Sequence, residues 1–214
     1  MPVDISHGHL HHVADQLRSE FTELEILPVT ADFTTDFELP QSAQRATHAA
    51  VYFPGSTIGN FEDDDVEQLL LSIARVCGAH GGLLIGIDLV KDNEILESAY
   101  NDRHGVTAEF NLNLLHRIDC ELDSDIDVDG FEHVAFFNEH ASRIEIYLRS
   151  RSDQTVRVDD QEFHFAGGEL IHTEFSHKYT IEGFSKLADR AGWELSRSWT
   201  DDQELFAVLH LVHA

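Results

Sequence analysis

Polar side chains follow two segments that the hydrophobic pattern predicts to be strands, a position where α/β proteins bind ligands. Asp4 ends the short apolar start of the chain, and Asp32 with Phe33 follows the apolar segment 24–30. An acidic residue at such a strand end accepts hydrogen bonds from ribose hydroxyls. An aspartate next to an aromatic ring could also hold the amino group and the ring face of an adenine. A plainer interpretation stays open, in which Asp4 stabilises the dipole of the next helix and Phe33 packs in the core.

A loop with two glycines, two hydroxyls and an amide follows the apolar segment 49–53. It spans residues 54–61, with the sequence Pro-Gly-Ser-Thr-Ile-Gly-Asn-Phe, and Asn60 is its amide. Loops at the carboxyl ends of parallel strands are where ligands bind in α/β proteins. No lysine follows the glycines and the surroundings are acidic, so the loop is not a phosphate-binding P-loop. We interpret it as a site loop.

A carboxylate and a hydroxyl lie two residues apart in the extended segment after Gly167 and Gly168. Because side chains alternate along a strand, Glu174 and Ser176 point to the same side. Together they could grip a ring that bears an N–H group, such as imidazole. Taken alone, the pair is equally typical of a surface strand.

Two other motifs invite a metal interpretation that the sequence does not sustain. Four histidines lie close together at positions 7, 9, 11 and 12, but no third ligand is fixed, so we expect solvated side chains at a helix start. The segment 125–130 matches the first half of a calcium loop. The twelfth position of that loop is Phe136, where a bidentate glutamate is needed. We therefore predict no metal site.

The charge balance excludes two classes of partner. The 214 residues include 40 acidic and 14 basic side chains, which gives a formal net charge of −26. Such a surface repels phosphate backbones and anionic lipids, so we expect neither nucleic acid nor membrane binding. No apolar run approaches the roughly 18–20 residues of a membrane span, and no secretory leader is recognisable. Cys77 and Cys120 lie in apolar patterns, which predicts two buried free thiols in a cytoplasmic protein.

The hydrophobic periodicity predicts alternating strands and helices at both ends of the chain and a different middle. Apolar strands separated by helices indicate a parallel sheet covered on both faces. The middle shows two helices and then alternating segments typical of an antiparallel meander. We therefore predict an α/β lobe over 1–90 and 179–214, interrupted by an α+β lobe over 91–178. The expected strands are 2–5, 24–30, 49–53, 83–88, 131–137, 143–150, 154–158, 162–165, 193–199 and 205–213, and the expected helices are 6–20, 63–79, 92–100, 107–122 and 180–191.

The segment 52–61, Tyr-Phe-Pro-Gly-Ser-Thr-Ile-Gly-Asn-Phe, closely resembles the signature of the histidine-specific Nα-methyltransferases of ergothioneine biosynthesis. The resemblance covers essentially the whole chain. It implies a Rossmann-like class I methyltransferase sheet, S-adenosylmethionine as cofactor, and an inserted α+β substrate-binding lobe. Further matching pieces follow in the family's order, at residues 2–6, 32–34, 99–102, 105–107, 131–133 and 171–176.

On the cofactor side, the resemblance implies roles for three residues. Asp4 looks like the acid that binds the ribose, and Asp32 with Phe33 looks like the pair that contacts the adenine. The implied reaction is methyl transfer to the α-amine of L-histidine, repeated until N,N,N-trimethylhistidine forms. No dedicated catalytic base is identifiable in the sequence.

On the substrate side, the resemblance implies roles for four residues. Asn60 and Tyr100 look like the residues that hold the α-amine and the α-carboxylate of the amino acid. Glu174 and Ser176 look like the pair that binds the imidazole and makes the family select histidine. A ring that donates hydrogen bonds leaves such buried polar groups unpaired when an apolar ring replaces it.

The chain departs from the family at its start. Family members begin upstream, with a helical segment that contacts substrate and then the first strand and its glycine-rich loop. No G-x-G loop follows a strand here. In this fold class the first strand lies between the strands that end at Asp4 and Phe53, so we expect unpaired edges on both and no cradle for the methionine part of the cofactor.

We therefore expect a family member that lacks its N-terminal third and is impaired alone. One hypothesis is a half-enzyme that needs an upstream complementary fragment. Others are a non-catalytic binding module and a methyltransferase for another amino acid, such as a tryptophan-type substrate.

Overall fold

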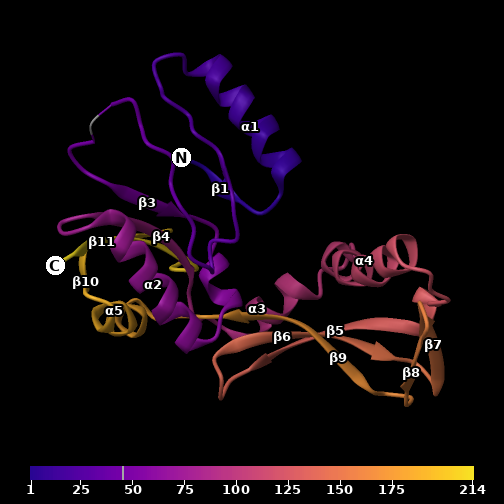
Figure 1. The fold of residues 1–214 in the computed structure, drawn as a ribbon. Coiled ribbons are helices and arrows are strands. Elements are labelled where there is room, and N and C mark those ends of the chain that lie inside the picture. Colours follow the sequence, from indigo (N-terminus) through magenta and orange to yellow (C-terminus); the bar gives the residue numbers. More distant parts are fainter. Residues whose placement is uncertain (45) are drawn as a thin grey trace.

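The structure is a computed structural model that describes residues 1–44 and 46–214. Its elements gather in two lobes (Figure 1). The chain leaves the first lobe after β4 (Gly82–Asp88) and returns to it after β9 (Leu170–His177). The two passes are paired, because the Tyr179 N–H donates to the Asp88 carbonyl at 2.9 Å and the Val90 N–H donates to the Tyr179 carbonyl at 3.0 Å. This pairing fixes the end of β4 against the end of β9.

The first lobe is centred on a four-stranded sheet of order β10–β11–β4–β3. β3 (Ala50–Phe53) is parallel to β4, whereas β11 (Phe206–His213) and β10 (Trp193–Thr200) are antiparallel to their neighbours. α2 (Asp63–Cys77) and α5 (Ile181–Arg190) pack on one face of this sheet.

The second face of the four-stranded sheet is less covered than the sequence suggests. Tyr52 lies on β3 with 68% of its surface exposed, and the strand alternates between exposed and half-buried residues. The expectation of a sheet covered on both faces is therefore wrong for the described residues. The apolar character of β4 reflects the face under α2 and α5, where Leu83, Ile85 and Ile87 are fully buried.

α2 follows from its sequence. Three aspartates occupy its first turn, where carboxylates stabilise the helix dipole. Its apolar stripe packs on the sheet, and Gly78 ends it with a φ of +71°, a conformation that favours glycine. The fully buried Trp193 seals this core, and its indole Nε1–H donates to the Leu70 carbonyl at 3.0 Å.

A separate two-stranded parallel sheet lies on the β3 side of the first lobe. It consists of β1 (Val3–Asp4) and β2 (Val29–Thr30), which are connected by α1 (His7–Glu20). Among the described residues, no strand pairs with the outer edge of β3 or with the second edge of β1. The six-stranded set of the first lobe is thus divided into two pieces.

β2 is much shorter than the predicted strand over 24–30. The Ile26 carbonyl accepts hydrogen bonds from Nε and Nη2 of Arg18, at 3.1 and 2.7 Å, instead of a strand partner. Pro28 has no N–H to donate. These two features leave only Val29 and Thr30 free to pair.

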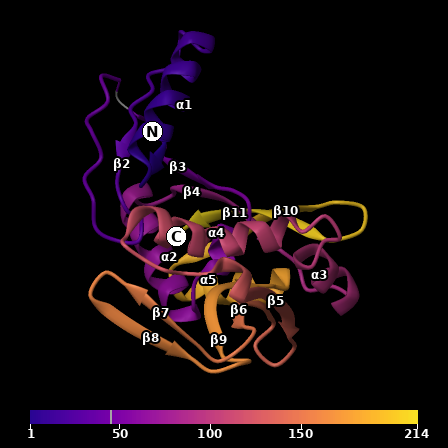
Figure 2. The ribbon, with the colours of Figure 1, turned by 90° about the vertical axis from the view of Figure 1, so that its right-hand side faces the viewer.

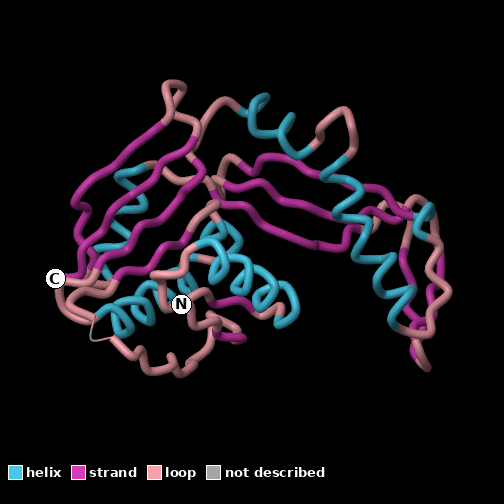
Figure 3. The backbone as a smooth tube through the Cα atoms, turned by 90° about the horizontal axis from the view of Figure 1, so that it is seen from above, coloured by secondary structure: helices cyan, strands magenta, loops and turns pink. Residues whose placement is uncertain are grey.

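The second lobe joins two helices to two small antiparallel sheets. α3 (Asn93–Tyr100) and α4 (Val106–Glu121) precede β5 (Phe131–Asn138), β6 (Arg143–Ser150), β7 (Gln154–Val158) and β8 (Gln161–Phe165). The single meander expected from the sequence is wrong: β6 pairs with β5 and β9, and among the described strands β7 pairs with β8. Figure 2 shows the β7–β8 hairpin as a separate unit, and Figure 3 shows the three-stranded sheet between the four-stranded sheet and this hairpin.

The two cysteines differ in burial. Cys77 is buried under the sheet, but Cys120 is exposed, so the expectation of two buried thiols is wrong for Cys120. α4 turns Asn111 and Leu115 inward, and Cys120 lies on the opposite side of the helix. Within the described residues, no helix combines the length and the apolar character needed to cross a bilayer.

Candidate functional site

A cavity of about 450 Å³ lies in the second lobe between α3, α4 and the β6–β9 pair. We call it the β9 cavity. Val106, Phe110 and Leu114 line it from one face of α4, because residues four apart on a helix lie above one another. Tyr100 at the end of α3 and Glu174 on β9 supply polar groups to this otherwise largely apolar wall.

A β-bulge on β9 decides which side chains reach the β9 cavity. Glu174 pairs with Ile146 and His172 pairs with Tyr147, so Thr173 is the extra residue. Its Oγ1 donates to the Ile146 carbonyl at 3.1 Å. The bulge changes the phase of the strand, so Glu174 lines the cavity while the His172 ring packs against Tyr147 on the opposite face of the sheet.

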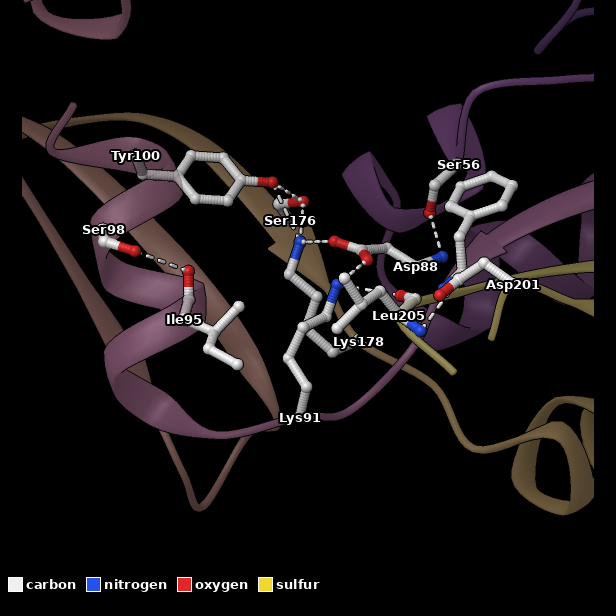
Figure 4. A network of polar contacts seen from close by, with 11 residues as sticks. Ser56, Asp88, Lys91, Ile95, Ser98, Tyr100, Ser176, Lys178, Asp201 and Leu205 are labelled. Carbon is white, nitrogen blue, oxygen red and sulfur yellow. Dashed lines mark hydrogen bonds and ion pairs between the residues drawn. The ribbon is translucent and has the colours of Figure 1, made fainter. Parts of the chain in front are cut away.

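Three polar side chains from α3 and β9 form a closed triangle beside the cavity (Figure 4). The Tyr100 hydroxyl lies 2.8 Å from Ser176 Oγ. Lys178 Nζ donates to Tyr100 Oη at 2.9 Å and to Ser176 Oγ at 2.8 Å. Ser176, Lys178 and Glu174 lie on the same side of β9 because they are two residues apart.

Lys178 connects this triangle to the first lobe. Its side chain is 0% exposed, and its Nζ lies 2.8 Å from Oδ2 of Asp88, the last residue of β4. The other oxygen of Asp88 accepts from Lys91 Nζ, and the Asp88 N–H donates to Ser56 Oγ at 2.9 Å. The loop after β3, the end of β4 and the end of β9 therefore form one polar network (Figure 4).

Asn60 and Glu174 form a second polar contact at this junction. Burial raises the pKa of the Glu174 carboxyl above its usual value, while a hydrogen bond with the Asn60 side chain and the charge of Lys178 oppose that rise. Asn60 ends the short 3-10 helix η1 (Thr57–Asn60). A Cβ on Gly59 would lie 2.9 Å from the His177 carbonyl oxygen, so only a glycine lets η1 approach β9 this closely.

The structure thus brings the four residues predicted for the amino acid to one place. Asn60 reaches Glu174, and Tyr100 reaches Ser176. Sequence reasoning missed Lys178 and Asp88. The signal for Lys178 was available, because it continues the alternation of Glu174 and Ser176 and is one of only three lysines in the chain.

The three residues predicted for the nucleotide lie at the edge of the first lobe. Asp4 Oδ1 accepts from the Ser6 N–H at 2.7 Å, and Asp32 Oδ1 accepts from Thr34 N and Oγ1 at 2.9 and 2.6 Å. The Thr34 contacts hold the pKa of Asp32 below its usual value. Both carboxylates are exposed at the carboxyl ends of the parallel strands β1 and β2.

Phe33 is half-buried and packs into the core of the first lobe. Its ring meets Phe53 and Phe61 edge-on, with centroid distances of 5.5 and 6.1 Å. A smaller cavity of about 270 Å³ lies beside it, lined by Thr34, Phe61, Asp65, Gln68 and Leu69. Among the described residues, no hydrogen bond or ion pair joins Asp4, Asp32 or Phe33 to the triangle around Lys178, so the two groups are distinct.

The β9 cavity offers both kinds of hydrogen-bonding group next to an apolar wall. The carboxylate of Glu174 accepts hydrogen bonds, and the Tyr100 hydroxyl, which is bonded to Ser176 beside the cavity, can also donate. Such a site suits a zwitterionic molecule that carries a flat ring with N–H groups.

Comparison with known proteins agrees with this geometry. Residues 1–213 match the model of a family described as histidine-specific methyltransferase, SAM-dependent. The chain is 39% identical over 204 residues to a histidine N-alpha-methyltransferase of Mycolicibacterium smegmatis, covering 94% of this chain and 62% of the relative. It is 38% identical over 211 residues to the protein of the same name from Mycobacterium tuberculosis, covering 97% of this chain and 64% of the relative. The chain therefore spans less than two thirds of the length of these relatives.

The comparison with solved structures concerns the fold. A S-adenosylmethionine-dependent methyltransferase from Clostridium acetobutylicum superposes with a TM-score of 0.51 at 11% sequence identity, covering 99% of this chain and 74% of the other. At this identity the likeness concerns the fold alone, and it is the class I methyltransferase fold predicted from the sequence.

Proposed function

Because the chain belongs to the family of S-adenosylmethionine-dependent, histidine-specific methyltransferases, we propose that it binds L-histidine in the β9 cavity. The bound histidine is methylated on its α-amine to N,N,N-trimethylhistidine, a step of ergothioneine biosynthesis. The observation that carries the proposal is the convergence of Asn60 on Glu174 and of Tyr100 on Ser176 at one end of this cavity.

The polar groups of the cavity complement those of histidine. We assign Glu174 and Ser176 to the imidazole, and Asn60 and Tyr100 to the α-amine and α-carboxylate. An amino acid whose ring carries no N–H group would leave the half-buried Glu174 carboxylate with Asn60 but without a ring donor, and an unmade hydrogen bond of this kind costs about 1–3 kcal/mol. That penalty is the physical basis of the proposed preference for histidine.

The cofactor proposed from the family is S-adenosylmethionine, and the residues at the edge of the first lobe fit its adenosine end. Asp4 and Asp32 present exposed carboxylates at adjacent strand ends, and Phe33 lies beside the 270 Å³ cavity. We assign Asp4 to the ribose, and Asp32 with Phe33 to the adenine. When bound, the cofactor supplies a methyl group already activated on a sulfonium, whose sulfur keeps the electron pair of the broken bond.

The residues of this chain contribute by binding and orientation. A donor that is already activated needs an amine held in one position, and holding the reactants together removes much of the entropic barrier. The pair of Asp88 and Lys178 ties the triangle of the cavity to the end of β4, where the first lobe presents its ligand edge. The amine must be unprotonated to react, and we assign no side chain as the base that removes its proton.

We also propose that a further polypeptide segment completes the first lobe. β1 and β3 each have an edge without a partner in the described residues, and such edges are templates for another strand. The chain spans 62% and 64% of the two mycobacterial relatives. On this basis the chain acts as one part of an enzyme whose methionine-binding part is supplied by an upstream fragment.

A larger aromatic amino acid is the second candidate substrate. The wall formed by Val106, Phe110 and Leu114 is apolar, and a cavity of about 450 Å³ has room for an indole. An indole has a single ring nitrogen, so it could pair with Glu174 but would leave Ser176 without a ring partner, whereas both nitrogens of an imidazolium ring carry an N–H. Histidine therefore remains the first proposal.

Calorimetry on the chain tests the proposed function. L-Histidine, L-tryptophan and S-adenosylhomocysteine are titrated separately into the purified chain. We expect saturable histidine binding that is tighter than tryptophan binding. Lack of histidine binding would overturn the proposed substrate, and tighter tryptophan binding would replace it with the second candidate.

A turnover assay tests the completing segment. The chain is incubated with S-adenosylmethionine and histidine, with and without the upstream segment of a mycobacterial relative added in trans, and methylated products are followed by mass spectrometry. We expect products only when the segment is present. Turnover by the chain alone would show that no further segment is required.

A further inference from the structure

Lys178 is the most completely buried charged side chain at the junction of the lobes, and the proposed function gives it only a role in joining them. Its side chain is 0% exposed. The three N–H groups of its ammonium have three acceptors within 2.9 Å, namely Asp88 Oδ2, Tyr100 Oη and Ser176 Oγ. The ammonium therefore has no N–H left for a ligand.

The ammonium restricts the two hydroxyls because lysine donates hydrogen bonds and never accepts them. Both Tyr100 and Ser176 must accept from Lys178. The hydroxyls also lie 2.8 Å from each other, so one of their two protons lies in the bond between them. Exactly one hydroxyl proton of the pair remains to be donated to a ligand.

The chemistry of the two hydroxyls favours one direction for the shared bond. A phenol is a stronger donor than an aliphatic alcohol, so the outward proton is best placed on Tyr100 when a charged acceptor is present. Ser176 then donates to Tyr100 and accepts from Lys178, which leaves one of its lone pairs for a ring N–H. Every donor and acceptor of the triangle has a use in this arrangement.

The charges around Lys178 suit an anionic ligand group. Asp88 is shared by two ammonium groups, those of Lys91 and Lys178, so these three side chains carry one net positive charge. The nearby Glu174 carboxylate, on which the charge of Lys178 also acts, is assigned to the imidazole. Of the polar groups of an amino acid, only the carboxylate accepts without donating.

We propose that Lys178 is a positioning residue that orders the hydrogen bonds from Lys178 to Ser176 to Tyr100, so that the Tyr100 hydroxyl donates to the substrate carboxylate. The inference rests on the proposed function, because it takes histidine as the ligand. It adds the element that makes the site select amino acids over the corresponding amines.

A comparison of histidine with histamine, which lacks only the carboxylate, tests this ordering. Binding of both ligands is measured by calorimetry for the unsubstituted chain and for Lys178→Met, which removes all three N–H donors at similar length. We expect the unsubstituted chain to prefer histidine, and Lys178→Met to reduce this preference about ten-fold or more. Lys178→Met leaves Asp88 paired with Lys91, so no carboxylate becomes isolated in the interior.

Lys91→Met is the matched control, because it removes the other ammonium from the same carboxylate without touching either hydroxyl. We expect it to keep the preference for histidine over histamine. Tyr100→Phe should lose the preference, and the double variant Lys178→Met/Tyr100→Phe should lose no more than Tyr100→Phe alone, because both changes remove the same donated proton.

Each outcome decides between the proposals. Equal weakening of histidine and histamine binding in Lys178→Met would show a purely structural role and overturn the inference, as would additive losses in the double variant. Lack of histidine binding by the unsubstituted chain would overturn the proposed function and the inference with it. If Lys178→Met does not fold, as judged by its circular dichroism, Lys178→Gln replaces it, since the amide keeps two N–H donors without the charge and should retain part of the preference.

Discussion

The two ligand regions of this molecule are built in different ways. Around the β9 cavity, Tyr100 and Ser176 lie 76 residues apart in the chain and are connected through a buried ammonium. At the edge of the first lobe, Asp4 and Asp32 are exposed, and among the described residues each side chain bonds only to groups two positions further along the chain. The substrate region is therefore ordered by the tertiary fold, and the nucleotide region by local turns.

This difference indicates how much of each region the chain organises by itself. Buried, mutually bonded side chains are fixed before a ligand arrives, which lowers the entropic cost of binding. The carboxylates of the nucleotide region lie beside the divided sheet, where β1 and β3 lack partners among the described residues. We therefore expect histidine binding to withstand changes in the first lobe, and nucleotide binding to depend on completion of the sheet.

The largest effect is expected for Glu174→Ala, which removes the carboxylate proposed to accept from the imidazole. A hydrogen bond to a charged group contributes about 1.5–3 kcal/mol, so histidine affinity should fall about ten- to a hundred-fold. Affinity for S-adenosylhomocysteine should not change. Calorimetry measures both, with the exposed Glu162→Ala on β8 as control. Equal losses of affinity for histidine and for S-adenosylhomocysteine would show that the two ligand regions are not independent.

The next largest effect is expected for Gly59→Ala, which places a methyl group in the contact between η1 and β9. The new Cβ would lie 2.9 Å from the His177 carbonyl oxygen, and this backbone atom can only move with its strand. We expect a loss of about 1–3 kcal/mol in the free energy of unfolding, measured by urea denaturation. Gly8→Ala is the control: it meets nothing within 4 Å in α1 and should stabilise the chain slightly. Unchanged stability of Gly59→Ala would mean that the loop is not pressed against β9.

A smaller effect is expected for Asp32→Asn in the nucleotide region. The amide keeps the size of the side chain but loses the charge that accepts from an adenine amino group, so affinity for S-adenosylhomocysteine should fall about ten-fold in the completed protein. Histidine affinity should stay the same. Asp36→Asn changes an exposed carboxylate of the same loop and serves as control. A drop in histidine affinity for Asp32→Asn would show that the two regions are coupled.

The smallest effect is expected from pH. Burial raises the pKa of Glu174, so its carboxylate form accumulates at a higher pH than that of an ordinary glutamate. Histidine binding should therefore strengthen as the pH rises through this pKa, and weaken as the pH falls through it. Calorimetry from pH 4 upward measures the slope in the unsubstituted chain and in Glu174→Gln, which corrects for titration of histidine itself. The same slope in both proteins would exclude Glu174 as the group that titrates.

The sequence predicted most helices and strands because their patterns are local. α2 and α5 show apolar stripes with clear ends, and β4 is a continuous apolar run. The pairing of β6 with β9 was missed, because the β7–β8 hairpin lies between them in the chain and the alternation of a strand does not identify its neighbour. The prediction of a strand over the whole of 24–30 was wrong for a related reason, because the Arg18 side chain donates to the Ile26 carbonyl.

The site was predicted only in part for the same reason. Motif resemblance identified Asn60, Tyr100, Glu174 and Ser176 one at a time, and the structure brings these four together. It did not identify Lys178 or Asp88, because an ion pair between two distant residues leaves no local pattern. The prediction that Cys120 is buried was also wrong, because an apolar pattern alone does not give the direction of a side chain near the end of α4.

The bulge at Thr173 has an evolutionary consequence. Because Thr173 is an extra residue, the His172 side chain points away from the cavity and the Glu174 side chain points into it, although the two are two positions apart on β9. Loss of a single codon there would bring β9 back to plain alternation, with His172 still opposite Tyr147 and Glu174 still opposite Ile146. Both side chains would keep their faces, and the cavity wall would lose the Thr173 side chain. The direction of the Glu174 carboxylate therefore does not depend on the extra residue, because that residue has no partner of its own on β6.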